Sequence, residues 1–112
     1  MGARDLLHEL DAAGFSVRVE DGAVLIKPAS KLTADICAAV RAEKAELMML
    51  VELRAALAAA INRACAARGD DDANRIALLA ECAERSPEDQ ADLIAHFTLV
   101  AIQYEAITRG SL

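Results

Sequence analysis

Aromatic residues are scarce in this chain. Its 112 residues include one tyrosine, two phenylalanines and no tryptophan, so aromatics make up 3% of the total. Hydrophobic residues nevertheless account for 55%, and alanine and aliphatic side chains must therefore form the core. Such a composition favours closely packed helices over a sheet sandwich. The length suits one compact domain, or one small domain with a helical extension.

Positive charge is in deficit. Twelve Lys and Arg residues stand against eighteen Asp and Glu, which gives a formal net charge of −6. An acidic chain repels phosphate backbones, and we find no basic patch that would offset this repulsion. We therefore expect no direct binding of nucleic acid.

Long apolar runs and a disulfide framework are also missing. No run approaches the roughly 18 apolar residues that span a bilayer, and the first residues lack the apolar stretch of a secretion signal. The three cysteines, Cys37, Cys65 and Cys82, show no CxxC spacing and lie in apolar helical patterns, where cysteine behaves as a small hydrophobe. These features predict a cytoplasmic protein that does not bind a membrane.

No combination of side chains predicts catalysis, a metal site or a cofactor. His8 and His96 are the only histidines, and neither lies at zinc-ligand spacing from a cysteine. Neither a glycine-rich phosphate loop nor a GxSxG motif is present. The aspartates at 70–72 lack the spaced ligands of a calcium loop, and helix capping explains them better. We expect a protein that is not an enzyme.

A β-hairpin is the clearest structural signal. Strands over 15–20 and 23–28 flank Asp21-Gly22, a preferred pair for a two-residue type I′ turn. The register set by this turn places four apolar side chains on one face, namely Val17, Val19, Val24 and Ile26. Two strands alone are marginally stable and leave both edges open. The edges are therefore either capped by a dimer mate or used to receive a peptide strand.

Helices are predicted on both sides of the hairpin. A short helix over about 3–13 precedes it, and Gly14 suits a left-handed cap at its end. After the hairpin, residues 34–68 contain neither proline nor glycine, which predicts one long helix or two with a bend. Thr33 is the expected N-cap of this helical region.

Two more helices follow Gly69, which ends the long helical region. The first begins at the aspartates 70–72, and the second begins at Ser86-Pro87, runs to about Thr108 and stops at Gly110. The last helix has an apolar row with a/d-like spacing: Leu93, Phe97, Val100, Tyr104 and Ile107. Such a row marks a seam inside a bundle or between chains. Core packing within one chain is the default interpretation, and an oligomer seam through Leu93, Phe97, Val100 and Tyr104 is the alternative.

The order of elements predicts a mostly helical α+β chain, with an α–β-hairpin–α unit over 1–50 and a helical hairpin or three-helix bundle over 51–112. The first unit resembles the N-terminal docking domains of nonribosomal peptide and polyketide synthases (TubC type), over about residues 4–50. The resemblance is carried by Leu6-Leu7 and Leu10 before Gly14, the strands around Asp21-Gly22, and Leu32-Thr33-x-Asp35-Ile36-x3-Val40-Arg41-x2-Lys44-x2-Leu47.

This resemblance implies a docking or adaptor module. Domains of that family are αββαα homodimers whose hairpin side receives a short, often charged peptide from another subunit. For this chain it implies a homodimer that binds a partner protein or linear peptide, and a helix break near 41–44. The implied binding residues are Arg18, Ala23, Leu25, Lys27 and Lys31. Their basic groups would suit an acidic peptide. Residues 53–112 match nothing in the synthases.

The acidic second half suggests a different function. A small acidic protein of a phage or other mobile element could inhibit a host nucleic-acid-binding defence complex by mimicking phosphates. The acidic surface would consist of Asp70, Asp71, Asp72, Glu81 and Glu84. The simpler interpretation is that these side chains solvate helix surfaces.

Overall fold

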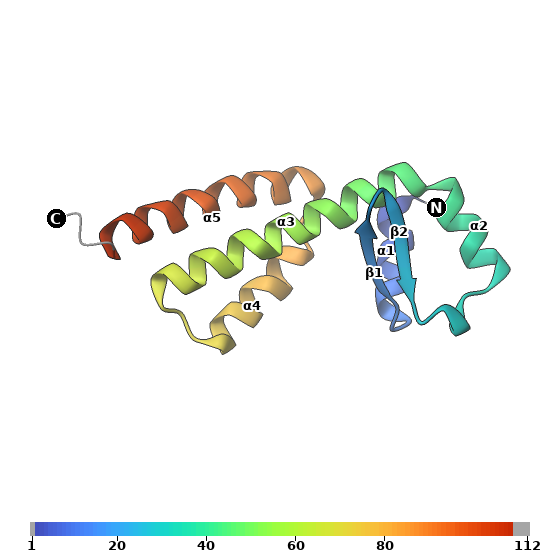
Figure 1. Cartoon of the computed structure of the whole chain (residues 1–112), viewed down its shortest axis with the longest axis horizontal. Helices are drawn as coiled ribbons and strands as arrows, with labels where there is room; N and C mark the ends of the chain where they lie inside the picture. Colours follow the sequence, from blue (N-terminus) through green and yellow to red (C-terminus); the bar gives the residue numbers. More distant parts are fainter. Residues whose placement is uncertain (1, 109–112) are drawn as a thin grey trace. The chain divides into compact units, whose positions relative to one another are not determined.

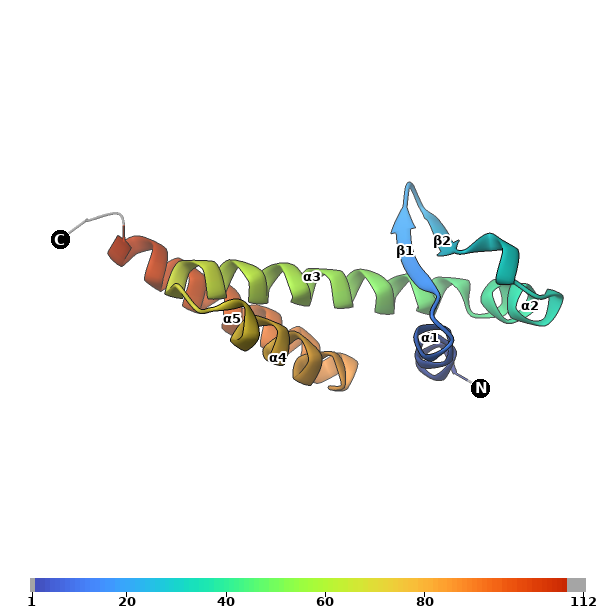
Figure 2. The same cartoon turned by 90° about the horizontal axis from the view of Figure 1, so that it is seen from below.

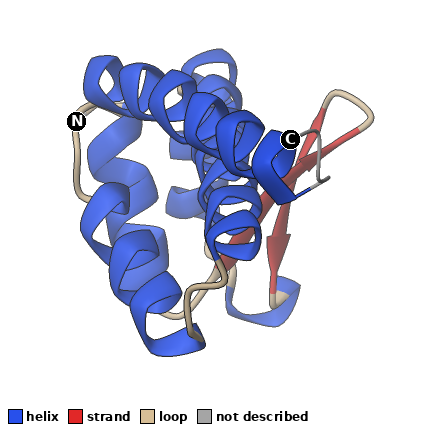
Figure 3. Cartoon of the chain, turned by 90° about the vertical axis from the view of Figure 1, so that its left-hand side faces the viewer, coloured by secondary structure: helices blue, strands red, loops and turns tan. Residues whose placement is uncertain are grey.

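The computed structural model describes residues 2–108, and Gly110, the expected end of the last helix, lies outside them. In this range the expected α+β class is confirmed: five α-helices accompany one antiparallel two-stranded hairpin (Figures 1 and 3). The helices are α1 (Ala3–Ala12), α2 (Ala34–Ala42), α3 (Lys44–Arg68), α4 (Asp72–Ala83) and α5 (Pro87–Thr108). The strands are β1 (Ser16–Glu20) and β2 (Ala23–Lys27), followed by the 3-10 turn η1 (Ala29–Lys31).

The chain divides into two compact units, residues 1–52 and 53–112. The sequence prediction placed a domain boundary after residue 50. Each unit has its own hydrophobic core, and α3 supplies buried residues to both. Among the helices that the structure describes, none is both long enough and apolar enough to cross a membrane.

The hairpin has the predicted register. Val17 lies opposite Ile26, and Val19 lies opposite Val24. Asp21 has φ 51° and the glycine after it has φ 75°, and two successive positive φ values define a type I′ turn. β1 begins one residue later than predicted and β2 ends one residue earlier, whereas their other ends are as predicted. Local turn chemistry and the two-residue period therefore suffice to fix the pairing.

The end of α1 is a Schellman motif. Gly14, with φ 86°, donates its N–H to the Asp11 carbonyl at 3.1 Å, and Phe15 donates its N–H to the Leu10 carbonyl at 3.0 Å. The side chains of Leu10 and Phe15 are both buried in the same core, which is the apolar contact that usually accompanies this motif. The chain therefore leaves α1 in a direction that leads directly into β1, beside which α1 lies (Figure 2).

In the first unit, helices cover the apolar face of the hairpin and form the hydrophobic core together with it. The buried residues of this core are Ala3, Leu6, Leu7, Leu10, Phe15, Val17, Leu47, Leu50 and Val51. They come from α1, from Phe15 just before β1, from β1 and from the first turns of α3. By contrast, α2 buries no residue fully and contributes only half-buried side chains. This burial supplies the stabilisation that an isolated hairpin lacks.

The helical region after the hairpin is interrupted at Glu43, between α2 and α3. This position lies inside the interval 41–44 that the family resemblance implied. The hydroxyl of Thr33 accepts the N–H of Ile36 at 3.2 Å, which confirms the expected N-cap of α2.

The second unit contains the rest of α3 together with α4 and α5. The Asp71 carboxylate accepts the N–H of Asn74 at 2.8 Å, and the Ser86 hydroxyl accepts that of Asp89 at 3.2 Å. Both predicted helix starts are thus confirmed. The core of this unit consists of Leu57, Ala60, Ile61, Ala64, Cys65, Cys82, Phe97 and Ala101.

A buried glutamine joins the ends of α4 and α5. Gln90 is 7% exposed, and its side-chain amide donates to the carbonyls of Ala83 at 3.3 Å and Arg85 at 3.2 Å. Ala83 is the last residue of α4 and Arg85 comes shortly after it, where carbonyls have no intrahelical partner. The sequence analysis did not single out this residue, because its polar side chain gives no sign of burial.

The row predicted on α5 needs correction at its C-terminal end. Leu93, Phe97 and Val100 do pack in or against the core of the second unit, but Tyr104 is 44% exposed and Ile107 is 60% exposed. The inward side chains instead follow the i+4 row Leu93, Phe97, Ala101 and Glu105. Helices commonly pack through ridges formed by residues four apart. The alternating spacing of four and three predicted from the sequence leaves this row of residues after two turns, so its later members turn away from the core.

The glycine that ends α1 provides a test of this fold. We expect Gly14→Ala to lower the free energy of unfolding by about 1 kcal/mol, because alanine is strained at a left-handed φ. A Cβ at this position would meet no atom within 4 Å, so backbone strain is the whole effect. Gly2→Ala is the comparison variant: Gly2 has an equally open site and a φ of −87°, and as the N-cap of α1 it should lose only the smaller preference for glycine over alanine at that position. Urea unfolding followed by circular dichroism measures both variants, and equal losses would contradict the prediction.

Candidate functional site

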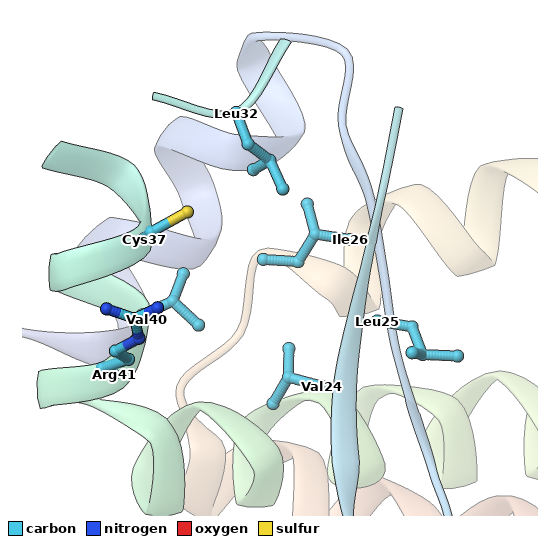
Figure 4. Close-up of a pocket in the computed structure, with 7 residues that line it drawn as sticks. All are labelled: Val24, Leu25, Ile26, Leu32, Cys37, Val40 and Arg41. Atoms are coloured by element: carbon cyan, nitrogen blue, oxygen red, sulfur yellow. The ribbon is translucent and has the colours of Figure 1, made fainter. Parts of the chain in front are cut away.

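A groove of about 330 Å³ lies between β2 and α2, inside the first unit (Figure 4). Its lining residues are Val24, Leu25, Ile26, Leu32, Cys37, Val40 and Arg41. Figure 4 shows that the side chains of Val24 and Ile26 point from β2 toward α2, whereas that of Leu25 points to the opposite side of the strand. Six of the seven lining residues are apolar or carry a thiol, and Arg41 supplies the single charge.

The groove exists because α2 covers the hairpin incompletely. The inner face of β2 presents branched aliphatic side chains, and Val24 and Ile26 remain half-buried there. On the opposite wall α2 places the short side chains of Cys37 and Val40. Short side chains leave space that larger ones would have filled.

The outer edge of β2 has no strand partner in the described part of the chain, because the sheet has only two strands. Glu20 and Ala23 flank the two-residue turn and form a hydrogen-bonded pair, after which bonded and non-bonded pairs alternate along the ladder. Leu25 therefore bonds to β1, whereas Val24 and Ile26 direct their N–H and C=O groups outward. The two residues with outward backbone groups are the same two whose side chains enter the groove.

The residues that the family resemblance implied lie on the outer face of the hairpin or just after it. Arg18 pairs with Leu25 across the strands, and the exposed Ala23 and Lys27 alternate onto the same face. Lys31 is exposed in η1. Of this set only Leu25 also lines the groove. The sequence analysis did not name Arg41 as a site residue, because only the packing of α2 beside β2 makes it part of a site.

Arg18 carries a local ion pair. Its guanidinium lies 3.6 Å from the carboxylate of Glu20, and both side chains are 57% exposed. An exposed pair of this kind contributes little to stability and opens readily. Arg18 therefore remains accessible to an acidic partner that approaches the outer face of the hairpin.

The three thiols differ in access. Cys37 is half-buried in the groove, whereas Cys65 and Cys82 are buried in the core of the second unit, and all three are free. Burial raises the pKa of the Cys65 thiol, and the neighbouring Asp70 carboxylate raises it further. Burial likewise raises the pKa of Cys82. Fewer thiolates at neutral pH make the two core cysteines less reactive.

The residues of the predicted acidic surface lie in local interactions or at helix ends. Asp71 is the N-cap of α4, and Glu84 lies at its exposed C-cap. Three other carboxylates form ion pairs, Arg68–Asp70 at 3.5 Å, Arg75–Asp72 at 3.6 Å and Arg85–Glu81 at 3.8 Å. A mimic of nucleic acid needs negative charge that is not balanced nearby. No observation favours this function over capping and local pairing.

Across residues 2–108, no group of three His, Cys, Asp or Glu side chains could hold a metal ion. His8 is exposed on α1, and His96 contacts the neighbouring Phe97 edge-on at 5.2 Å between ring centres. Comparisons of this chain with models of protein families, with curated proteins and with solved structures find no match. The function must therefore be argued from the groove and the strand edge themselves.

Thiol reactivity tests whether Cys37 in the groove is more accessible than the two core cysteines. At about pH 8 we expect one thiol to react quickly with a disulfide reagent such as dithionitrobenzoate and two to react slowly, because burial suppresses the thiolate of the core cysteines. Absorbance of the released thiolate gives the number and rate of each class. Cys37→Ser should remove the fast phase alone. Three equal rates in the native protein would contradict this assignment.

Proposed function

We propose that this chain is a non-enzymatic docking module that binds an extended peptide of a partner protein along the open edge of β2. The peptide adds a third strand to the hairpin, a mode of recognition in which backbone hydrogen bonds give affinity and side-chain pockets give specificity. The observation that supports the proposal most is the double role of Val24 and Ile26, which combine outward backbone groups with side chains in the groove.

An added strand would present its side chains alternately to the two faces of the hairpin. One set enters the groove between β2 and α2, where apolar side chains fit beside Val40. The other set lies on the outer face near Leu25 and Lys27. A peptide that alternates apolar with acidic residues therefore matches both faces, because the groove is mainly apolar and Lys27 supplies positive charge on the outer face.

A peptide fits this site better than a small molecule does. A volume of about 330 Å³ lies at the lower end for small-molecule pockets. A compact ligand in the groove would leave the outward N–H and C=O groups of β2 without a protein partner. An extended backbone satisfies those groups and fills the groove in one binding event.

The proposal agrees with the resemblance of residues 4–50 to synthase docking domains, whose hairpin side receives a linear peptide. It differs in one respect, since Arg41 and the inner-face residues join the basic outer-face residues in the proposed site. The three free thiols suit a reducing compartment, and we place the activity in the cytoplasm.

A synthetic peptide of alternating valine and glutamate tests the charge requirement. We expect Lys27→Glu to weaken its binding about tenfold, because an attractive charge beside the peptide's glutamates on the outer face becomes repulsive. Arg85→Glu makes the same charge change on the second unit, where Arg85 pairs with Glu81, and should leave the affinity unchanged. Fluorescence anisotropy measures both, and equal effects of the two substitutions would contradict a site along β2.

The same peptide, methylated on alternate backbone nitrogens, tests strand addition. Methylation removes the N–H donors of one edge of the peptide, so one methylated series should lose binding while the other series retains it. Amide chemical shifts of the protein should move at Val24, Ile26 and the residues of α2. Binding that survives both methylation patterns would show that the peptide does not extend the sheet.

A further inference from the structure

A second apolar stripe runs along α5 on the side away from the core of the second unit. It consists of four exposed residues at 4-3-4 spacing, Ala95, Leu99, Ile102 and Ala106. Leu99 is 56% exposed and Ile102 is 49% exposed. At 100° per residue these side chains lie on the side opposite Phe97 and Ala101, which face the core. The helix is thus apolar on both sides, a property of helices that are covered on both sides.

Along α5 itself, the stripe has almost no charged neighbours. Between Leu93 and Thr108 the only charged residue is Glu105. Its carboxylate accepts two hydrogen bonds from Arg63 of α3, at 2.7 Å from Nη2 and 2.9 Å from Nε, and this interaction raises the pKa of Arg63. The charge of Glu105 is therefore neutralised within the unit and does not act on the stripe.

This distribution of charge decides what the stripe can bind. A strongly charged partner would find no opposite charge there to select it. Two copies of an acidic chain, with a net charge of −6, repel each other wherever their charged surfaces meet. The uncharged length of α5 is a place where two copies can meet without that repulsion, and centres of interfaces are generally depleted of charge.

We propose that two copies of this chain associate through α5, with the two helices antiparallel and Leu99 of each copy packed on Ile102 of the other. The spacing is symmetric about the point midway between these two residues. A two-fold axis through this point, perpendicular to the helices, pairs leucine with isoleucine at the centre and Ala95 with Ala106 at each end. The a and d positions of coiled coils pair in a similar way. The small alanines allow the helices to approach closely.

Charge at the start of α5 favours the antiparallel orientation. Glu88, Asp89 and Asp92 occupy the first turns of the helix. Parallel helices would bring these carboxylates together in the dimer. With the antiparallel axis, the two copies of Asp92 lie about 25 Å apart along the helices, well beyond the screening length of about 8 Å at physiological ionic strength.

The association involves only the second unit and is independent of the proposed peptide site. The stripe extends about 17 Å from Ala95 to Ala106, so the interface is small and the dimer weak. It should form over the micromolar range and dissociate on dilution. Loss of the dimer would leave binding of the valine–glutamate peptide unchanged, and loss of peptide binding through Lys27→Glu would leave the dimer unchanged.

Sedimentation equilibrium of the full chain tests the interface. We expect a monomer–dimer equilibrium in the wild type, and Leu99→Glu should raise the dissociation constant by about 100-fold or more, because it places a charge at the centre of the contact. Ile76→Glu is the matched control, since Ile76 is 58% exposed on α4, and it should not change the dissociation constant. A monomeric wild type at all concentrations, or a Leu99→Glu variant that dimerises like the wild type, would overturn the proposal.

Disulfide trapping tests the orientation. In a Cys37→Ser background, Ala95→Cys and Ala106→Cys proteins are mixed and oxidised with diamide, which accepts the two electrons and two protons released by each pair of thiols. The antiparallel dimer gives mainly the mixed disulfide, whereas a parallel dimer gives mainly the disulfides of each variant with itself. Predominance of the latter would overturn the antiparallel arrangement.

Discussion

Both hydrophobic cores depend on α3. Its first turns place Leu47 and Leu50 in the core of the first unit, and its later turns place Ile61 and Cys65 in the core of the second. A helix can serve two cores only if it is uninterrupted, and residues 44–68 contain neither glycine nor proline. The hairpin gains its stability from this helix and α1, and α4 and α5 gain theirs from its second half.

The proposed peptide site follows from the limits of a two-stranded sheet. Helices can cover its apolar face, but they cannot pair with the backbone groups at its edges. Here α2 contributes only half-buried side chains, so Val24 and Ile26 keep an adjoining groove as well as outward backbone groups. In the proposed site, this incomplete cover of the hairpin leaves β2 open to a peptide. Burial of the same inner face keeps the hairpin in one register while its edge stays open.

The two proposals reinforce each other through valency. One unit offers a groove for a peptide, and the other offers an uncharged stripe on α5 for a second copy of the chain. A dimer would carry two peptide sites, and a partner that holds two copies of the peptide would bind it with greater avidity than one site provides. A weak dimer and a weak peptide site would then act together as a docking device.

The sequence by itself determined the local structure, because the signals involved act between neighbouring residues. The turn at Asp21-Gly22 fixed the hairpin register, and Thr33, Asp71 and Ser86 marked helix starts through their side-chain oxygens. The packing of helices decided the rest. It selected the i+4 row of α5 that faces the core, left Tyr104 exposed, buried Gln90 and brought Arg41 to the groove beside β2. These outcomes depend on contacts between residues distant in the chain. For α5 the periodicity alone is ambiguous, because the helix is apolar on two sides and either side could face inward.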